Sequence, residues 1–136
     1  MPFEFCGEVS SSKSLLNRAL IVQSYFPSLQ ILGDSQSEDV VHLKDSLKTL
    51  SENSEHFVGD GGTTLRFLAL RLSRIPGQHK IFGSQRLFQR PHRGLWSVVK
   101  DLGAHAEVGK HHAIIFSRGW KIPQKPIALL SSETSQ

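Results

Sequence analysis

The 136-residue sequence lacks features that several classes of protein depend on. It has one cysteine, Cys6, which excludes an intrachain disulfide and a zinc site built from several cysteines. No uninterrupted apolar run is long enough to span a membrane. The first residues, MPFEFCGEV, carry two glutamates and no basic stretch, unlike a secretory signal. We therefore expect a cytoplasmic protein without a membrane partner.

Acidic residues are also in the minority. Twelve Asp and Glu stand against 16 Lys and Arg, which gives a formal net charge of +4 and a pI near 9.5. A basic protein favours anionic partners, but its charge does not separate a nucleic acid from a small phosphorylated metabolite. Four histidines match no zinc spacing and have no carboxylate cluster beside them, namely His92, His105, His111 and His112. We therefore expect no metal site.

Hydrophobic spacing predicts helices alternating with strands. Helices are expected at 13–25, 34–52, 63–73 and 90–104, and strands at 1–9, 29–33, 56–59, 79–83, 104–108, 112–117 and 125–132. The string ILG at 31–33 returns as IFG at 81–83, an offset of 50 residues. The sequence therefore indicates an α/β (α+β) protein in which a unit of about fifty residues occurs twice.

Three stretches carry residues suited to binding an anion. The first, SSSKSLLNRAL, puts Lys13 at the start of a helix, where the helix dipole disfavours a cation unless an anion lies nearby. The second, GDGGTTLRFLAL, has glycines between a strand and a helix, so backbone N–H groups can approach a phosphate closely. The third, SQRLFQRPHRG, contains Arg86, Arg90 and Arg93, whose guanidinium groups suit carboxylates and phosphates. Each also has a simpler interpretation, as a capped helix, a tight turn or a solvated basic loop.

Taken in order, these stretches resemble the motifs of the 5-enolpyruvylshikimate-3-phosphate synthase family. SKSLLNRAL is similar to the family's Ser-Lys-Ser-x-x-Asn-Arg-Ala-Leu signature, and GDGGTTLRFLA to its Gly-Asn/Asp-x-Gly-Thr-x-x-Arg loop. QRLFQRPHRGLWSVVKDLGA is similar to its Arg-x-x-x-Arg-Pro-x-x-x-Leu segment. SEDVVHL resembles its Ser-Asp-Asp segment, and the final ETSQ resembles its Ser-Ser-Gln site. The resemblance runs from about Ser10 to Gln136, which is nearly the whole chain.

The resemblance implies a fold and a reaction. Family members have two domains, each made of three β-α-β-α-β-β units in an inverse α/β barrel. By this likeness, residues 1–12 would be a strand and loop, and residues 13–136 would be two units of a truncated N-terminal substrate-binding domain. The family transfers the enolpyruvyl group of phosphoenolpyruvate to the 5-hydroxyl of shikimate 3-phosphate, in the pathway to chorismate and the aromatic amino acids. It uses no metal and no organic cofactor.

The resemblance also implies roles for individual residues. Lys13 would contact both substrates and act in catalysis. The residues expected to hold shikimate 3-phosphate are Ser14, Arg18, Thr134 and Ser135. Gly62 and Arg90 would hold phosphoenolpyruvate, and Gln136 would lie between the two ligands. The residues expected to line the same cleft are Asp39, Asp60, Thr63 and Arg66.

Several departures from the family pattern qualify these expectations. Ser10 and Ser11 stand where Pro-Gly is usual, and Asp60 adds a carboxylate beside a phosphate site. The chain is about a third as long as a full synthase, and the family's catalytic acid and base belong to the missing part. We therefore expect this chain to be inactive alone and to need the C-terminal part of the synthase as its partner.

Two other interpretations remain. The sister enolpyruvyl transferase that acts on UDP-N-acetylglucosamine shares the fold, although SKSLLNR fits the shikimate branch better. A basic anion- or nucleic-acid-binding module would suit the charge, but no aromatic RNA-binding motif is present. A salt-dependent interaction with generic DNA, without binding of shikimate 3-phosphate, would favour that second interpretation.

Overall fold

The computed structural model describes residue 7 and residues 10–129 of the chain. Within that part, helices and strands follow one another in the order α1 (Lys13–Gln23), α2 (Glu38–Lys48), β1 (Glu55–Phe57), α3 (Gly62–Ser73), β2 (Gly77–Phe82), α4 (Gln85–Gln89), α5 (Arg93–Asp101), β3 (His105–Val108) and β4 (His112–Ser117). Helices and strands therefore mix along the chain, as the hydrophobic spacing predicts.

The four strands form one mixed sheet in the order β1-β2-β4-β3. β1 and β2 run parallel, which requires the crossover that α3 provides. β3 and β4 form an antiparallel hairpin, and β4 then pairs antiparallel with β2. The loop after β1 therefore lies at the carboxyl end of a parallel strand and leads directly into α3.

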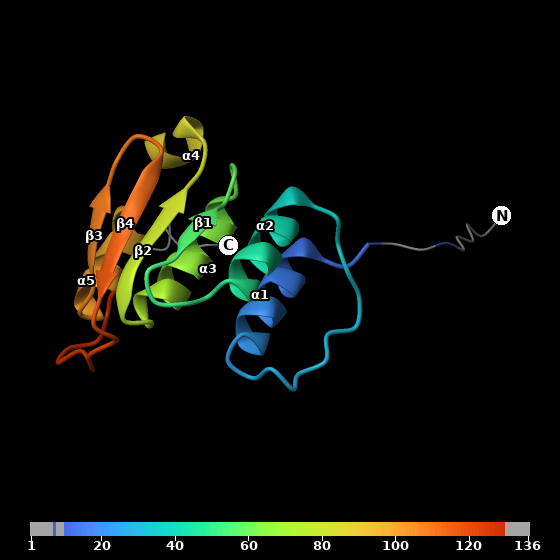
Figure 1. Cartoon of the computed structure of the whole chain (residues 1–136), viewed down its shortest axis with the longest axis horizontal. Helices are drawn as coiled ribbons and strands as arrows, with labels where there is room; N and C mark the ends of the chain where they lie inside the picture. Colours follow the sequence, from blue (N-terminus) through green and yellow to red (C-terminus); the bar gives the residue numbers. More distant parts are fainter. Residues whose placement is uncertain (1–6, 8–9, 130–136) are drawn as a thin grey trace.

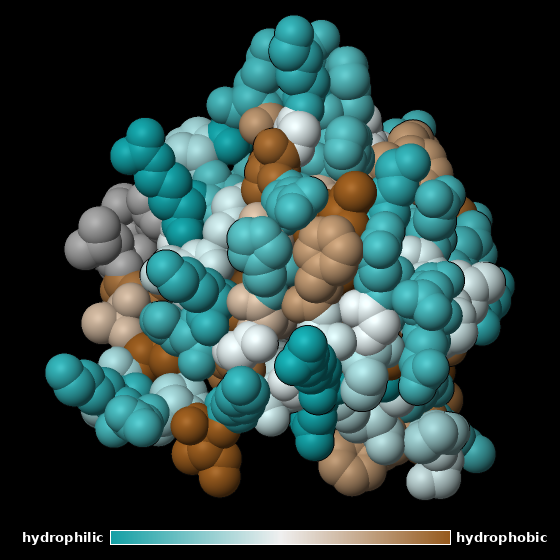
Figure 2. Space-filling model, turned by 60° about the vertical axis from the view of Figure 1, so that its left-hand side comes forward, coloured by the Kyte–Doolittle hydropathy of each residue, from teal (hydrophilic) through white to brown (hydrophobic). Residues whose placement is uncertain are grey.

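Helices cover one face of this sheet (Figure 1). α3 packs on β2 and β4, α5 packs on β3, and α2 reaches β1. α1 packs against α2 and α3 beyond the sheet, on the right in Figure 1. Figure 2 brings forward the left-hand side of Figure 1, where β3 and β4 lie, and this side is mostly hydrophilic with a few hydrophobic groups in its middle.

The hydrophobic core lies between the helices and the sheet, and α3 is its centre. Leu65, Leu68 and Leu72 recur every three or four residues along α3 and are fully buried. They meet Ile81 of β2 and Ile115 of β4 in the same core cluster. This packing holds α3 firmly under the sheet, so its first turn has a defined position.

The structure confirms most of the expected elements and corrects two of the strands. Residues 29–33 form no strand, and Leu29 and Leu32 are 41% and 94% exposed. Residues 125–129, the described part of the expected last strand, form no strand either. An apolar pattern makes a strand only where a neighbouring strand pairs with it, and neither segment has one among the described residues. The expected strand at 1–9 lies almost wholly outside the described residues.

The fourth expected helix, at 90–104, is observed as α5 (Arg93–Asp101). A short helix that was not expected, α4 (Gln85–Gln89), precedes it. Arg90 is extended, with φ −71° and ψ 148°, because the ring of Pro91 disfavours helical geometry in the residue before it. This break leaves Arg90, Pro91 and His92 as a short connection between the two helices.

Residues 55–117 place strands and helices in the order β1-α3-β2-α4-α5-β3-β4. The described residues before them contribute two helices and no strand. A mixed α+β fold is therefore established, and the second copy of the unit remains a prediction.

Candidate functional site

The first turns of α1, α2 and α3 are joined through one carboxylate. Lys13, the first residue of α1, places its Nζ 2.7 Å from Oδ2 of Asp39 in the first turn of α2. The hydroxyl of Thr64, in the first turn of α3, donates to the backbone oxygen of Asp39 at 3.1 Å. Three helix N-termini from separate parts of the sequence thus lie together around Asp39.

The ion pair with Asp39 explains how Lys13 is tolerated at the start of a helix. A cation at a helix N-terminus is disfavoured, whereas the acidic Asp39 is favoured at its own helix N-terminus. The protein supplies the anion from α2, so Lys13 is stabilised without any ligand. The Lys13 side chain is still 54% exposed, against 24% for Asp39. Its ammonium group is therefore held in place and remains accessible from solvent.

The glycine-rich loop approaches the same carboxylate. Gly59 has a φ of +55°, in the left-handed region that favours glycine. The amide of Gly61 donates to the oxygen of Val58 at 3.0 Å and closes the turn. A Cβ on the buried Gly61 would lie 2.9 Å from Oδ1 of Asp39 and 2.9 Å from Oγ1 of Thr64. Gly61 is thus a glycine because the backbone passes directly beside these side chains.

α3 begins without a side chain to cap it. Its N-cap residue is Gly61, which makes no side-chain hydrogen bond, and its first turn contains no acidic residue. The guanidinium group of Arg66 lies over this start, since a Cβ on Gly62 would be 3.5 Å from its Nη1. The partial positive charge of the helix end and a guanidinium group therefore lie together here.

Arg90 joins Arg66 at this place. Burial lowers the pKa of Arg66 below its ordinary value, and the positive charge of Arg90 lowers that pKa further. Burial also lowers the pKa of His92, and the charges of Arg66 and Arg90 act in the same direction. The basic cluster, which we define as Arg66, Arg90 and His92, brings one residue of α3 together with the connection between α4 and α5.

Asp60 lies in the glycine loop and accepts a hydrogen bond from the hydroxyl of Ser84. The same hydroxyl accepts from the amide of Leu87 at 3.1 Å and so caps α4. Ser84 also donates its backbone amide to the oxygen of Gly59 at 3.0 Å. Asp60 is therefore bound to the loop that follows β2, which fixes the glycine loop from its other side.

Ser14 and Arg18 lie one turn apart on α1. Arg18 donates to the backbone oxygen of Ser14 at 2.9 Å and also bonds the Ser14 hydroxyl. The Arg18 guanidinium carbon is 5.5 Å from the centre of the Phe67 ring on α3. Both residues are exposed, on the part of α1 next to Lys13.

The structure thus brings most of the expected site residues to one region. Around the first turns of the three helices, it gathers Lys13, Asp39, Gly62, Thr63 and Arg66, with Asp60 in the adjoining loop and Ser14 and Arg18 along α1. Arg90 is tied to the region through its charge interaction with Arg66. Thr134, Ser135 and Gln136 lie outside the described residues.

Sequence reasoning missed Ser84, and it did not foresee the bond from the Thr64 hydroxyl to the backbone of Asp39. Ser84 precedes a short helix, and this N-cap signal was available in the letters GSQRLF. His92 was considered only as a possible metal ligand. Within the described residues, no group of three or more His, Cys, Asp or Glu could hold a metal ion.

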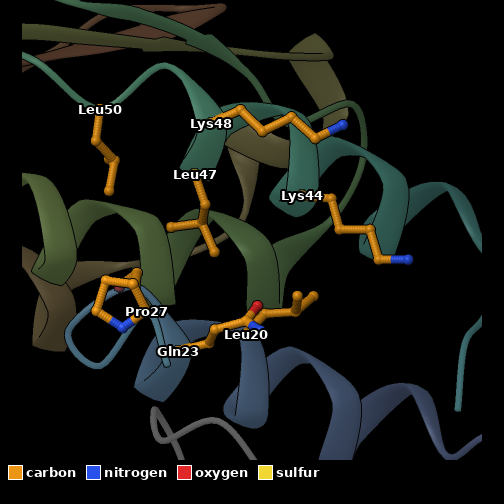
Figure 3. A pocket seen from close by; sticks show the side chains of 8 residues that line it. Leu20, Gln23, Pro27, Lys44, Leu47, Lys48 and Leu50 are labelled. Atoms are coloured by element: carbon orange, nitrogen blue, oxygen red, sulfur yellow. The ribbon is translucent and has the colours of Figure 1, made fainter. Parts of the chain in front are cut away.

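A cavity of about 470 Å³ lies elsewhere, at the other ends of α1 and α2. Figure 3 shows Leu20, Leu47, Leu50 and Pro27 around it, with the side chains of Lys44 and Lys48 extending to one side. Leu20 is the lining residue of α1 that comes first along the chain, and seven residues of helix place it about 10 Å from Lys13. The cavity is therefore separate from the predicted site. No helix in residue 7 or residues 10–129 is long and apolar enough to cross a membrane.

Comparison with known proteins adds a relationship to this geometry. No family model matches the chain. It is 37% identical over 101 residues to a 3-phosphoshikimate 1-carboxyvinyltransferase of Bacteroides fragilis, covering 74% of this chain and 24% of that protein. A second strain's enzyme of the same name is 36% identical over 104 residues, with the same coverage. One from Opitutus terrae is 29% identical over 162 residues, covering 96% of this chain and 37% of that protein. The chain thus spans about a quarter to a third of the length of these curated relatives.

Proposed function

The chain belongs to the 3-phosphoshikimate 1-carboxyvinyltransferase family, and from this premise we propose that it is the N-terminal part of such an enzyme. The complete enzyme would move the enolpyruvyl group of phosphoenolpyruvate to the 5-hydroxyl of shikimate 3-phosphate and release phosphate. This chain would supply one face of the substrate cleft. In the full fold it would contribute repeated β-α-β-α-β-β units, and it would work in the cytoplasm.

One observation carries the proposal for the site. The motifs that resemble the family's substrate-binding motifs are far apart in the sequence, yet they adjoin in space. Lys13 bonds Asp39, the backbone of Asp39 bonds Thr64, and Arg66 lies over Gly62. Both proposed substrates carry a phosphate and a carboxylate, so a region of cations and helix N-termini suits them chemically.

Each group has a proposed task that follows from its chemistry. Arg18 and the hydroxyl of Ser14 would hold shikimate 3-phosphate, with Thr134 and Ser135 assisting. The amide at Gly62 and the guanidinium of Arg90 would hold phosphoenolpyruvate. Lys13 would contact both ligands, with Gln136 between them and Asp39, Asp60, Thr63 and Arg66 lining the cleft. No metal or organic cofactor is required by this scheme.

The proposed division of labour leaves the chemical step to the remainder of the enzyme. The transfer breaks the bond between carbon and the phosphate oxygen of phosphoenolpyruvate and forms an ether with the sugar-like ring. Proton transfer to and from the reacting carbon needs an acid and a base. We propose that these groups lie in the missing part, so the chain alone should release no phosphate from the two substrates. Steady phosphate release by the purified chain would contradict this statement.

The binding role is tested by removing one guanidinium group. Arg18→Ala should weaken binding of shikimate 3-phosphate about tenfold or more, since a charge-assisted hydrogen bond contributes about 1.5–3 kcal/mol. Isothermal titration calorimetry of the chain with shikimate 3-phosphate measures this directly. Arg86→Ala is the matched control, because Arg86 is exposed on α4, away from α1. Equal affinity of Arg18→Ala and the original chain would show that the assignment is wrong.

A surface on α1 supports the need for the rest of the enzyme. Leu15 and Val22 lie seven residues apart on α1, hence on one side of this helix, and are 69% and 47% exposed. Phe26, just after the end of α1, is 64% exposed. Beside them, a groove of about 360 Å³ is lined by Val22 together with Arg18, Ile21, Tyr25, Phe67, Leu70, Arg71 and Trp120. The relatives are about three to four times longer than the part matched here. We propose that the missing C-terminal part covers this surface.

Reassembly from two pieces tests that partnership. The chain mixed with a separately produced C-terminal part should recover phosphate release, and Val22→Glu should prevent the recovery because it buries an unpaired charge. Val108→Glu is the control, since Val108 is equally exposed, at 48%, but lies on β3. Equal recovery with both variants would contradict the proposed covering of α1.

A further inference from the structure

His92 is a buried histidine with one ring nitrogen that no group satisfies. It is the N-cap residue of α5 and is only 8% exposed. Its Nε2 lies 2.9 Å from the backbone oxygen of Leu87, and a carbonyl oxygen can only accept, so Nε2 carries the hydrogen. Nδ1 is therefore the bare nitrogen, and it is buried without a hydrogen-bond partner. Buried polar atoms without partners are uncommon and call for a cause.

Among the residues that the structure describes, the charges that act on His92 are positive. Arg66 comes from α3, and Arg90 comes from the end of α4. Burial is the main cause that lowers the pKa of His92, the bond to Leu87 opposes it, and the two guanidinium groups lower it further. Within the described part of the chain, no carboxylate contributes to this shift. Burial first, and the two guanidinium charges after it, therefore favour the neutral form of the imidazole.

The position of the basic cluster suggests a ligand for Nδ1 of His92. Arg66 lies over Gly62, at the start of α3, where no side chain caps the helix. Arg66, whose charge acts on His92, therefore also lies over an uncapped helix end. A doubly charged anion bound there would cancel the two positive charges of Arg66 and Arg90, so a proton on Nδ1 would no longer be repelled.

We propose that His92 is a further residue of the anion site and takes up one proton from solvent at Nδ1 when a phosphate-bearing ligand binds at Arg66 and Arg90. This inference rests on the proposed function, because it deepens the phosphoenolpyruvate half of the same cleft. The protonated Nδ1 is a hydrogen-bond donor, so the ligand gains a third cationic group that the empty site does not hold. Anion affinity should accordingly increase as the pH falls, by up to about tenfold per pH unit for one linked proton.

Sulfate is the probe, because it keeps the same charge from about pH 5 to about pH 8, where histidine titrates. Its affinity for the full chain is measured by calorimetry across that range. His92→Gln keeps an amide that can donate to Leu87 but has no titrating group. His111→Gln is the matched control, since His111 is exposed in the turn between β3 and β4. The original chain and His111→Gln should bind sulfate more tightly at low pH, and His92→Gln should lose that dependence.

The outcomes separate this inference from the proposed function. Sulfate binding that does not vary with pH, or that varies equally in His92→Gln, overturns the role of His92 and leaves the anion site in place. Absence of sulfate binding at every pH overturns the anion site and His92 together. If His92→Gln fails to fold, ring-proton NMR of the original chain decides, because sulfate must raise the pKa of His92. An unchanged pKa overturns the inference.

Discussion

Replacing Gly61 by alanine tests how closely the glycine loop lies against Asp39. The φ of Gly61 is −73°, which alanine adopts readily, so backbone strain does not enter. The added Cβ would lie 2.9 Å from both Oδ1 of Asp39 and Oγ1 of Thr64. These distances are too short for a carbon, so the two side chains must move. The contact between Lys13 and Asp39 is then disturbed as well.

The expected cost can be summed from these contacts. Loss of the hydrogen bond from Thr64 to Asp39 costs about 1 kcal/mol, and loss of the partly exposed ion pair about 0.5 kcal/mol. Crowding of a buried position adds about 1–3 kcal/mol. The lower entropy of the unfolded alanine chain returns about 0.4–1 kcal/mol. We therefore expect Gly61→Ala to reduce the free energy of unfolding by about 3 kcal/mol.

Urea unfolding followed by far-UV circular dichroism measures this loss. Gly62→Ala is the control one residue further on, because its Cβ would have its nearest neighbour at 3.5 Å, an ordinary contact with Arg66. Gly62 starts α3 without a positive φ, so alanine there should stabilise the fold by about 0.5 kcal/mol. Opposite signs for the two variants are expected. Equal stability of both would refute the close approach of Gly61 to Asp39.

Three further predictions concern stability. Burial, with the charge of His79 as a smaller cause, lowers the pKa of His56 to about 4. As the pH falls from about 6.5 to about 4, His56 takes up a proton in the unfolded chain but not in the folded chain. The free energy of unfolding should therefore decrease by up to about 3 kcal/mol over that pH range. His56→Gln should remove this group's part of the decrease in pH-dependent urea midpoints, and an unchanged pH profile would contradict it. Asp39→Asn should cost about 1 kcal/mol or less in the same assay, because its partner Lys13 is half exposed, and a loss above about 3 kcal/mol would contradict that view. Trp120→Phe should cost about 1 kcal/mol by removing the 2.9 Å hydrogen bond from the indole to Ser73, and an unchanged thermal midpoint would mean that this bond contributes nothing.

The local elements were largely predictable from the sequence, because their causes are local. Leu65, Leu68 and Leu72 recur at helical spacing, and this pattern alone predicts α3 within one residue of its first position. The hairpin of β3 and β4 follows from alternating residues around Gly109 and Lys110. Prediction failed for Leu29 to Gly33, because a strand depends on a partner that the letters of the segment do not contain.

The sequence predicted which residues could form the candidate site, but it did not predict which of them contact one another. Lys13 was expected to need an anion, and the interpretation looked to a ligand for it. The structure supplies Asp39, 26 residues away, because α1 and α2 pack with their first turns together. Pro91 was expected at the first turn of a helix, and α5 begins two residues after it. The short α4 before it was not expected, and Pro91 gives Arg90 its extended geometry between the two helices.

The sequence by itself determined where the four longer helices lie, which stretches have the chemistry to bind phosphate, and which family the chain resembles. Those properties depend on spacing and residue type within short segments. Only the tertiary structure decided that Arg66 and Arg90 share one place with the bare Nδ1 of His92, and that Gly61 passes directly beside Asp39. Such contacts join residues that packing of the core around α3 brings together. Their distances, burial and charge interactions therefore arise only when the chain has folded.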